Sequence, residues 1–422
     1  MKRTFYVILL AFLLILSGLT YWLLLYKPTK QTIPTKPSKT VQRIHLHRDS
    51  FKHLPGWLKA SDQKKSFLAF QISCQTLLRQ NPENNAGSKM LPLKVKDWHP
   101  ACLAAAAISK QSLTNQQAKT FFERWFSPVT FYQKARDKNH PLKGLFTGYY
   151  MPLLQGSLVK TTEYNVPIYG VPDNLISINL GRFDTQWENK RLVGRIQKNE
   201  MIPFYTRAQI DKGALKEHAP VLVWTNSMMD RLNLEIQGSG VIQLPNDEQL
   251  YLGYATGNGA AYTHLAHVLI EQGVFTRDTA SMQAIRAYFK SHPEKMNPMI
   301  HRNKSFVFFR VLDKQIALGA QGVGLTSGYS LAVDRQWLPM GIPIWLNTTH
   351  PDQTRQDKRV LQRLMIAQDT GGAIRGMVRG DVYWGAGQRA ETIAGKMRNQ
   401  GEYWFLVPKH ITLVQTSLIN PS

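Results

Sequence analysis

Residues 367–387 read AQDTGGAIRGMVRGDVYWGAG, and this glycine-rich stretch with two aspartates decides how the fold is interpreted. Glycine lets a backbone approach a ligand closely and allows turns with positive φ. The stretch contains neither GxGxxG nor GxxxxGK[ST], so a phosphate-binding loop is not indicated. Asp381 lies between Gly380 and the apolar run Val382, Tyr383 and Trp384. Apolar surroundings raise a carboxyl pKa, which suits a general acid, but an aspartate in a glycine loop can equally cap a turn. Composition alone leaves both interpretations open.

The pattern of apolar, Gly and Pro residues changes along the chain at about residue 140. Helical spacing dominates before residue 140, and short β-rich runs punctuated by Gly and Pro dominate after about residue 144. The expected strands are 146–150, 166–171, 221–224, 235–243, 249–254, 305–310, 341–347, 361–367 and 402–407, and the expected helices are 62–80, 97–110, 115–126, 262–272 and 278–291. At 422 residues the chain has room for two or three domains. The pattern predicts an α+β protein, mainly β, with two barrels.

Short motifs follow one another in a fixed order between residues 140 and 410. They are TGYY at 147–150, PIY at 167–169, QGSG at 237–240, GNG at 257–259, SMQAIR at 281–286, SFVFF at 305–309, SLAVD at 330–334, QDTGGAI at 368–374, GDVY at 380–383 and GAG at 385–387. In this order they resemble the membrane-bound lytic murein transglycosylase A family, whose C-terminal barrel carries three aspartates. Unrelated chains would not carry so many of these motifs in order, so the resemblance is specific.

The resemblance implies a definite domain organisation. A double-psi β-barrel catalytic domain would occupy 313–410, and a second, barrel-like β domain would be inserted at 145–312. A helical segment at 60–144 would pack with the catalytic barrel. In the family the glycan lies in a groove between the two β domains, and neither a metal nor a cofactor takes part.

The resemblance also implies a reaction. Such enzymes cleave the β-1,4 bond between N-acetylmuramic acid and N-acetylglucosamine in peptidoglycan and leave a 1,6-anhydro end, so the chain would be a carbon–oxygen lyase. The family's catalytic aspartate matches Asp381. One carboxyl can protonate the leaving oxygen and then accept the proton of the attacking C6 hydroxyl. Ordinary glycosidases need two carboxylates, whereas an intramolecular nucleophile removes the need for the second.

Further residues are implied by the same motifs. Asp369 and Asp334 match the other two family aspartates. They would either raise the pKa of Asp381 or hold the barrel by accepting hydrogen bonds from backbone N–H groups. The residues implied to bind substrate are Thr147, Gly148, Tyr149, Gln237, Gly238, Ser239, Gly240, Gly371 and Gly372.

The chain has two cysteines, each on an expected helix. Cys74 and Cys102 are too few for a disulfide scaffold or a four-thiolate zinc site, but they can form one bridge. In an oxidising compartment we expect that bridge. Two buried thiols acting as small hydrophobic side chains are the alternative.

The N-terminal residues predict a membrane anchor. Residues 5–26 carry no charge and are long enough to span a bilayer, and no small-residue cleavage site follows them. We therefore expect an uncleaved anchor at 5–26 and a basic, proline-containing tether at 27–59, with a cleaved signal peptide as the alternative. The catalytic part would lie in the periplasm, held at the inner rather than the outer membrane.

The charge is strongly positive, with 52 Lys and Arg against 28 Asp and Glu, for a net charge of +24. This favours an anionic partner: the stem-peptide carboxylates of peptidoglycan, an anionic membrane surface, or nucleic acid. No nucleic-acid motif is present, so we expect peptidoglycan glycan strands and the membrane as partners, with other cell-wall enzymes as further candidates. A hydrolytic muramidase and a non-catalytic peptidoglycan-binding protein remain the rival functions.

Overall fold

The computed structural model of the chain describes residues 43–88, 90–134, 139–187, 190–352, 359–413 and 418–419. The expected anchor at 5–26 and the first part of the tether lie outside these residues. Within the described ranges, no helix has both the length and the apolar character needed to cross a bilayer.

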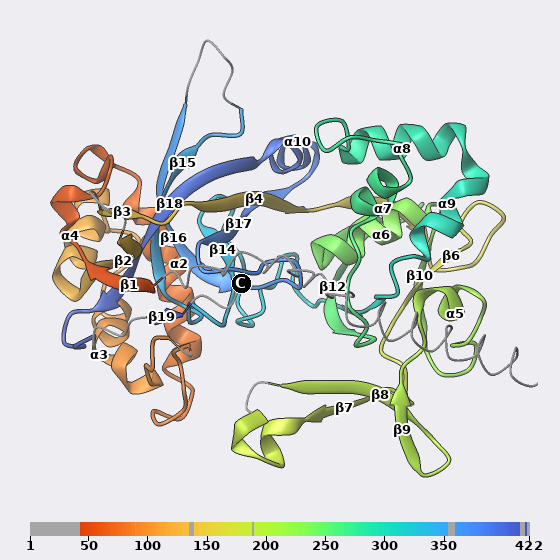
Figure 1. The fold of residues 1–422 in the computed structure, drawn as a ribbon, viewed down its shortest axis with the longest axis horizontal. Coiled ribbons are helices and arrows are strands. Elements are labelled where there is room, and N and C mark those ends of the chain that lie inside the picture. Colours follow the sequence, from red (N-terminus) through yellow and green to blue (C-terminus); the bar gives the residue numbers. More distant parts are fainter. Residues whose placement is uncertain are drawn as a thin grey trace, which may run out of the picture. The chain divides into compact units, whose positions relative to one another are not determined.

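Two large β-sheets form the framework of the structure (Figure 1). The strands of the larger sheet are β1 (Arg43–Arg48), β2 (Phe126–Lys134), β3 (Asn139–Pro141), β4 (Gly144–Met151), β14 (Ser330–Val333), β15 (Pro343–Thr349), β16 (Val360–Asp369), β17 (Arg379–Ala386) and β18 (Arg398–Pro408), and the short β19 spans Leu418–Ile419. Neighbouring pairs run β15–β16–β14–β17–β4–β18, and β18 also pairs with β15. These six strands therefore close into a barrel, which abolishes exposed strand edges. The double-psi connectivity of this barrel stays a prediction.

The second sheet follows β4 in the chain. Its strands, in the order in which they pair, are β13 (Val307–Val311), β12 (Gln249–Gly257), β11 (Ser239–Gln243), β5 (Leu153–Ser157), β10 (Val221–Thr225) and β6 (Val166–Tyr169). A small third sheet contains β7 (Ile176–Asn179), β8 (Arg191–Gln197) and β9 (Glu200–Pro203). The helices in this region are α5 (Arg207–Asp211), α6 (Met228–Gln237), α7 (Leu265–Glu271), α8 (Met282–Ser291) and α9 (Pro293–Ile300).

Strand β4 crosses the domain border that was predicted at residue 144/145. It pairs with β17 and β18 along the barrel, and the chain joins the second sheet only at β5. The texture change at residue 144 marks the start of a strand, but a strand signal does not tell which sheet the strand joins. The first strand of the expected insertion is therefore part of the barrel.

The predicted tether is also too long. Residues 43–59 form β1, which pairs with β2, and two short 3₁₀ helices at Phe51–His53 and Trp57–Lys59. Trp57 is fully buried, lies edge-on to Trp345 and donates from its indole N–H to Glu123. Burying a tryptophan stabilises the fold by a few kcal/mol, which outweighs the extended tendency of a basic segment.

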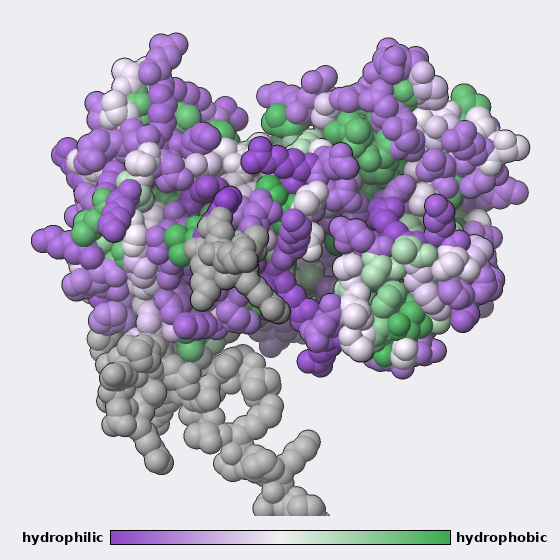
Figure 2. Space-filling model, turned by 90° about the horizontal axis from the view of Figure 1, so that it is seen from above, coloured by the Kyte–Doolittle hydropathy of each residue, from purple (hydrophilic) through white to green (hydrophobic). Residues whose placement is uncertain are grey.

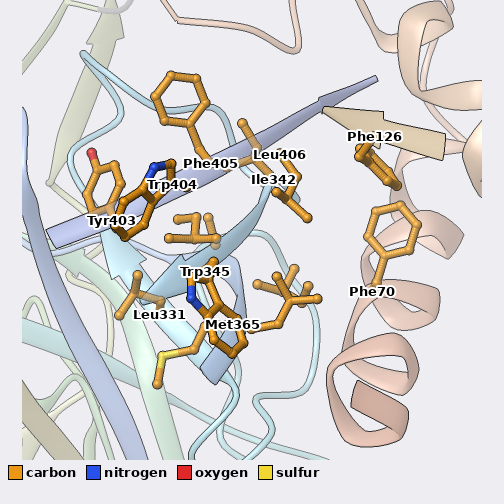
Figure 3. Packing of buried hydrophobic residues seen from close by; sticks show 14 of the residues in the cluster. Phe70, Phe126, Leu331, Ile342, Trp345, Met365, Tyr403, Trp404, Phe405 and Leu406 are labelled. Atoms are coloured by element: carbon orange, nitrogen blue, oxygen red, sulfur yellow. The ribbon is translucent and has the colours of Figure 1, made fainter. Parts of the chain in front are cut away.

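Large apolar side chains pack on both faces of the barrel wall (Figure 3). Trp345 on β15 and Trp404 on β18 are paired in register, and Phe405 lies opposite Ile344. Both strands are buried over most of their length, so they read as continuous apolar runs instead of alternating ones. This explains why 341–347 and 402–407 were recognised as strands from sequence.

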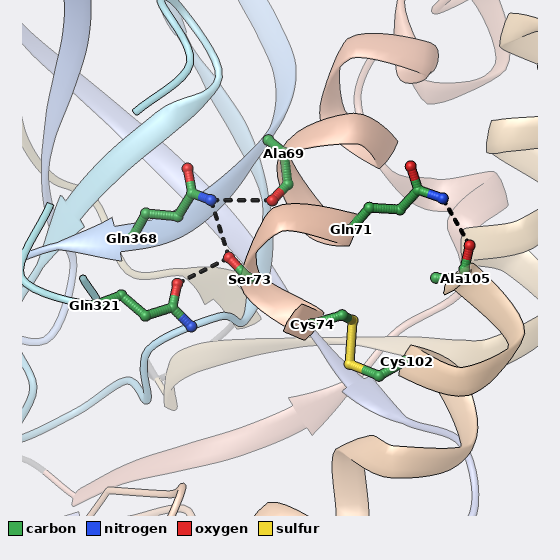
Figure 4. Close-up of a disulfide and its surroundings, with 8 residues drawn as sticks. All are labelled: Ala69, Gln71, Ser73, Cys74, Cys102, Ala105, Gln321 and Gln368. Atoms are coloured by element: carbon green, nitrogen blue, oxygen red, sulfur yellow. Dashed lines mark hydrogen bonds between the residues drawn. A yellow bond between two sulfur atoms is a disulfide. The ribbon is translucent and has the colours of Figure 1, made fainter. Parts of the chain in front are cut away.

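Three helices pack on the barrel: α2 (Gln63–Leu77), α3 (Val95–Ala106) and α4 (Asn115–Trp125). The fully buried Gln368 of β16 donates to the Ala69 carbonyl at 3.0 Å and to the Ser73 hydroxyl at 2.9 Å, both on α2 (Figure 4). Buried amides are stable only when such partners are present. Because Gln368 immediately precedes Asp369, this contact also fixes the strand that carries one of the candidate carboxylates.

The expected disulfide is present between Cys74 of α2 and Cys102 of α3 (Figure 4). It closes a loop with a sequence separation of 28 residues. Replacing both cysteines by alanine should lower the free energy of unfolding by about 3 kcal/mol, because the unfolded chain regains the entropy of that loop. Denaturant titration measures this; equal stability of the variant and the oxidised parent protein would contradict it.

Two local expectations were wrong. Residues 235–237, expected as the start of a strand, end helix α6, and the strand begins at Ser239 after the positive-φ Gly238. The glycine-rich 379–386 was not expected as a strand, yet it forms β17, followed by the unexpected helix α10 (Gln388–Lys396). Glycine has a low β propensity, so pattern analysis misses a strand whose pairing is set by its neighbours.

Candidate active site

Two adjacent barrel strands bring Asp381 and Thr147 together. β17 and β4 are parallel, with Asp381 the partner of Thr147 and Tyr383 the partner of Tyr149. Partners in register share a face of the sheet, so these four side chains project on one side. The Thr147 hydroxyl donates to Asp381 Oδ1 at 2.6 Å, and Asp381 itself is only partly buried. One carboxyl group, held by one hydroxyl, is thus partly accessible at the barrel wall.

The second carboxylate lies two strands away. Ala332 of β14 is the register partner of both Asp381 and Asp369, so a small side chain separates the two acids. Asp369 accepts from the Tyr149 hydroxyl at 2.8 Å and from the backbone N–H groups of Ala320 and Thr370, at 2.9 and 2.8 Å. These three donors occupy both of its oxygens. Asp369 is consequently held in place by more donors than Asp381, which accepts from the Thr147 hydroxyl.

The two aspartates have perturbed pKa values for the same main reason. Burial raises the pKa of Asp381 to about 6; the Thr147 hydrogen bond and the Arg379 charge oppose the rise, and the Asp369 charge adds to it. Burial also raises the pKa of Asp369, against the pull of its three donors. Burial and the Asp369 carboxylate raise the pKa of Tyr149 well above its usual value. The pKa of Asp381 thus falls close to neutral pH, where an acid can also act as a base.

Asp334 plays a different part. It is almost fully buried and accepts from the backbone N–H groups of Gly376 at 2.8 Å and Gln336 at 3.1 Å. The Arg375 guanidinium lies 3.9 Å from its other side. These contacts tie the turn after β14 to the glycine-rich loop before β17. Whether Asp334 holds the barrel or also tunes Asp381, the two roles considered from sequence, stays a prediction.

Only some of the candidate substrate-binding residues lie at the carboxylates. Thr147 and Tyr149 are at the carboxylates, whereas Gly148 faces the other side of β4, where a Cβ atom would lie 2.7 Å from the Trp384 indole. Gln237 accepts from the backbone N–H of Tyr150 at 3.0 Å, so its carbonyl positions β4. The remaining candidates are Gly238 at the C-cap of α6, Ser239 and Gly240 in β11, and Gly371 and Gly372 in the loop after β16.

The second sheet reaches the site through a small apolar cluster. Tyr149 and Tyr383 of the barrel pack in one cluster with Val241 of β11, and Tyr251 of β12 lies against it. Both the barrel and the second sheet therefore lie next to the carboxylates. Sequence analysis overlooked Arg379, which contacts Thr147, and it placed Trp384 only beside Asp381; the position of Arg379 two residues before Asp381 was the available signal.

No group of three or more His, Cys, Asp or Glu side chains in the described part of the chain is arranged to hold a metal ion. The Asp381 carboxyl group, with the hydroxyl groups of Thr147 and Tyr149 near the two aspartates, can carry out acid–base chemistry. Figure 2 shows one face of the molecule covered mainly by hydrophilic side chains, in keeping with the high net charge.

Comparison with known proteins identifies the family. A model described as the MltA specific insert domain matches residues 145–310, and a 3D domain model matches residues 329–407. Membrane-bound lytic murein transglycosylase A of Escherichia coli K12 is 33% identical over 264 residues, which are 62% of this chain and 65% of that relative's length.

Solved structures agree with this result. MltA from Neisseria gonorrhoeae matches with a TM-score of 0.71 at 30% identity, covering 90% of this chain and 95% of that one. Escherichia coli MltA with bound chitohexaose matches with a TM-score of 0.58 at 26% identity, covering 83% and 91%. The chain described here belongs to the membrane-bound lytic murein transglycosylase A family.

Proposed function

We propose that the protein is a peptidoglycan lytic transglycosylase. It would cleave the β-1,4 bond between N-acetylmuramic acid and N-acetylglucosamine and leave a 1,6-anhydro-N-acetylmuramic acid end, as part of cell-wall turnover. The observation that carries the proposal is a single partly buried carboxyl, Asp381, whose pKa is raised to about 6 and whose neighbouring carboxylate is occupied by donors. The family membership supports the same chemistry.

The proposed mechanism uses Asp381 twice. As an acid it gives its proton to the glycosidic oxygen, which leaves as the 4-hydroxyl of N-acetylglucosamine while the C1–O4 bond of the muramic acid unit breaks. As a carboxylate it then accepts the proton of the C6 hydroxyl of the same unit as O6 bonds to C1. No water is consumed, and Asp381 returns to its protonated state. Because the nucleophile belongs to the substrate, a second catalytic carboxylate is not required.

The remaining roles follow from this mechanism. The glycan would lie where barrel and insert meet, against Thr147 and Tyr149, and the bound chitohexaose of the Escherichia coli relative supports a β-1,4-linked amino sugar as ligand. We also propose a membrane anchor at residues 5–26, a periplasmic catalytic part and cell-wall enzymes as partners. The word membrane-bound in the names of the relatives supports the membrane part.

Digestion of purified murein tests the reaction. Muropeptides released by a transglycosylase are 18 Da lighter than those from a hydrolase, because the anhydro end replaces the reducing end and its water. Mass spectrometry separates the two products. A hydrolytic muramidase would yield only reducing ends, and a non-catalytic binding protein would bind murein without releasing any fragment.

The pH dependence gives a second test. Because Asp381 must be protonated for the first step, activity should decline as pH rises through about 6, the pKa of that carboxyl. Initial rates measured from pH 4 to pH 8 should therefore show a basic limb near pH 6. A rate that stays constant across that range would contradict an acid role for Asp381.

A further inference from the structure

We infer that Arg379 is a positioning residue: its guanidinium orients the Thr147 hydroxyl toward Asp381 Oδ1, which leaves Oδ2 as the oxygen that carries the transferred proton. This inference rests on the proposed function of Asp381. It assigns a role to a side chain that the mechanism above does not use, and it decides between the two oxygens of the carboxyl.

The Arg379 guanidinium is fixed by backbone on both strands. Nη1 donates to the Leu145 carbonyl of β4 at 3.2 Å and to the Gly380 carbonyl of β17. Nη2 donates to Thr147 Oγ1 at 2.8 Å. The parallel register pairs Arg379 with Leu145 and Asp381 with Thr147, so the three polar side chains follow one another along the same face. A planar fork held at two carbonyls has little freedom to turn away.

The chemistry of the groups determines the direction of each hydrogen bond. A guanidinium has only donors, so Thr147 Oγ1 must accept from Arg379. The hydroxyl has one hydrogen, and the Asp381 Oδ1 atom lies 2.6 Å away to receive it. A proton on Oδ1 would face that hydroxyl hydrogen. As long as the Thr147 hydroxyl donates to Oδ1, the proton of the protonated carboxyl resides on Oδ2.

The electrostatic surroundings agree with this assignment. The hydrogen bond from Thr147 and the positive charge of Arg379 both lower the pKa of Asp381, against burial and the charge of Asp369, which raise it. Arg379 thus limits the increase in the pKa of Asp381 that burial causes. The carboxyl can therefore still act as a base in the second step. Four polar or charged side chains of the described residues surround Asp381: Thr147 and Tyr149 on β4, Asp369 on β16 and Tyr383 on β17. His264, before α7, is near Arg379.

The test measures the titration of Asp381 directly. Aspartate carboxyl carbons are labelled with carbon-13 and followed by NMR from pH 3 to pH 9, with the Asp381→Asn spectrum identifying the Asp381 signal. We expect Arg379→Gln and Thr147→Val each to move the midpoint upward, by about one pH unit for the loss of the charge. Thr147→Ser keeps the hydroxyl and should retain the parental midpoint, as should Arg310→Gln, which removes an exposed arginine on β13.

Kinetics supply a readout that a purely structural role would not move. Arg379→Gln should lower kcat roughly tenfold with little change in KM. Arg379→Gln and Thr147→Val should both shift the basic limb to higher pH. Arg379→Lys retains the charge but loses the fork, so it should keep the midpoint near the parental one while kcat stays reduced.

Each outcome decides the inference. Parental midpoints in both Arg379→Gln and Thr147→Val would overturn it, and if one variant does not fold the other still decides. The NMR titration does not depend on turnover, so it separates the inference from the proposed function. If the parent protein releases no anhydro-muropeptides but the variants show the shifted midpoints, the proposed function is refuted and the positioning role of Arg379 is retained.

Discussion

Asp381→Asn should abolish the release of anhydro-muropeptides while leaving murein binding intact. The amide keeps the shape of the carboxyl, and its oxygen can still accept from Thr147, but it can neither give nor take the transferred proton. Losing a general acid typically costs about 10²–10⁴-fold in rate, and here one group serves as both acid and base. Product masses from murein digestion give the rate, and sedimentation with insoluble murein gives the binding.

Asp369→Asn and Asp334→Asn are the matched controls, because both change an aspartate of the same barrel. Asp369→Asn removes a charge that raises the pKa of Asp381, so some turnover should survive with the basic limb shifted to lower pH. Asp334→Asn loosens the turn held to Gly376, so its main effect should be on stability. A folded Asp381→Asn protein that digests murein near the parental rate, with either control inactive, would transfer the catalytic role to that other aspartate.

Asp381→Asn should also change the stability of the fold in a pH-dependent way. The folded pKa of Asp381 is about 6, above the ordinary aspartate value of about 4, so the fold disfavours the ionised form. Between these two values the unfolded chain has lost its proton and the folded chain retains it, so stability falls as pH rises. Asp381→Asn lacks this loss. Its melting temperature should match that of the parent protein below pH 4 and exceed it above pH 6.

Much of this site could be predicted from the sequence, because its parts lie in short contiguous motifs. Asp381, Asp369, Thr147 and Tyr149 were all singled out, and the structure places the four together. What could not be predicted was the pairing that joins them. That pairing depends on β4 joining the barrel, although β4 lies more than 200 residues before β17 in the chain.

The role of Gln237 shows a further limit of motif analysis. Its motif suggested a sugar-binding amide, which stays a prediction; in the structure its carbonyl accepts from the Tyr150 backbone and its amide contacts Asn233 of the same helix. A glutamine that binds ligand and one that braces a strand look identical in sequence. Only the orientation of α6 against β4 distinguishes them, and that orientation depends on how α6 itself is anchored in the second domain.

Helix α6 is anchored by a buried ion pair. Glu235 of α6 accepts from both terminal nitrogens of Arg207 on α5, and both side chains are almost fully buried. Arg207 also donates to the carbonyls of Asn303 at 3.1 Å and Ser305 at 2.5 Å. The other nearby cation, Arg231, stays 3.6 Å from Glu235 and makes its shorter contact, 2.6 Å, with Asp211. The buried negative charge of Glu235 is therefore balanced mainly by the Arg207 guanidinium.

Arg207→Ala should consequently lower the free energy of unfolding by about 3–5 kcal/mol, since it leaves a buried carboxylate without its bidentate partner and two carbonyls without donors. Denaturant titration measures the loss. The double variant Arg207→Met/Glu235→Leu removes both charges at similar volume, so it should recover the part of the loss that comes from the unpaired carboxylate but not the part that comes from the two carbonyls. Lys94→Ala, which breaks an exposed ion pair with Glu83, should be hard to distinguish from the parent protein. If Arg207→Ala were as stable as Lys94→Ala, the ion pair would not stabilise the fold, and the anchoring of α6 would rest on its apolar face alone.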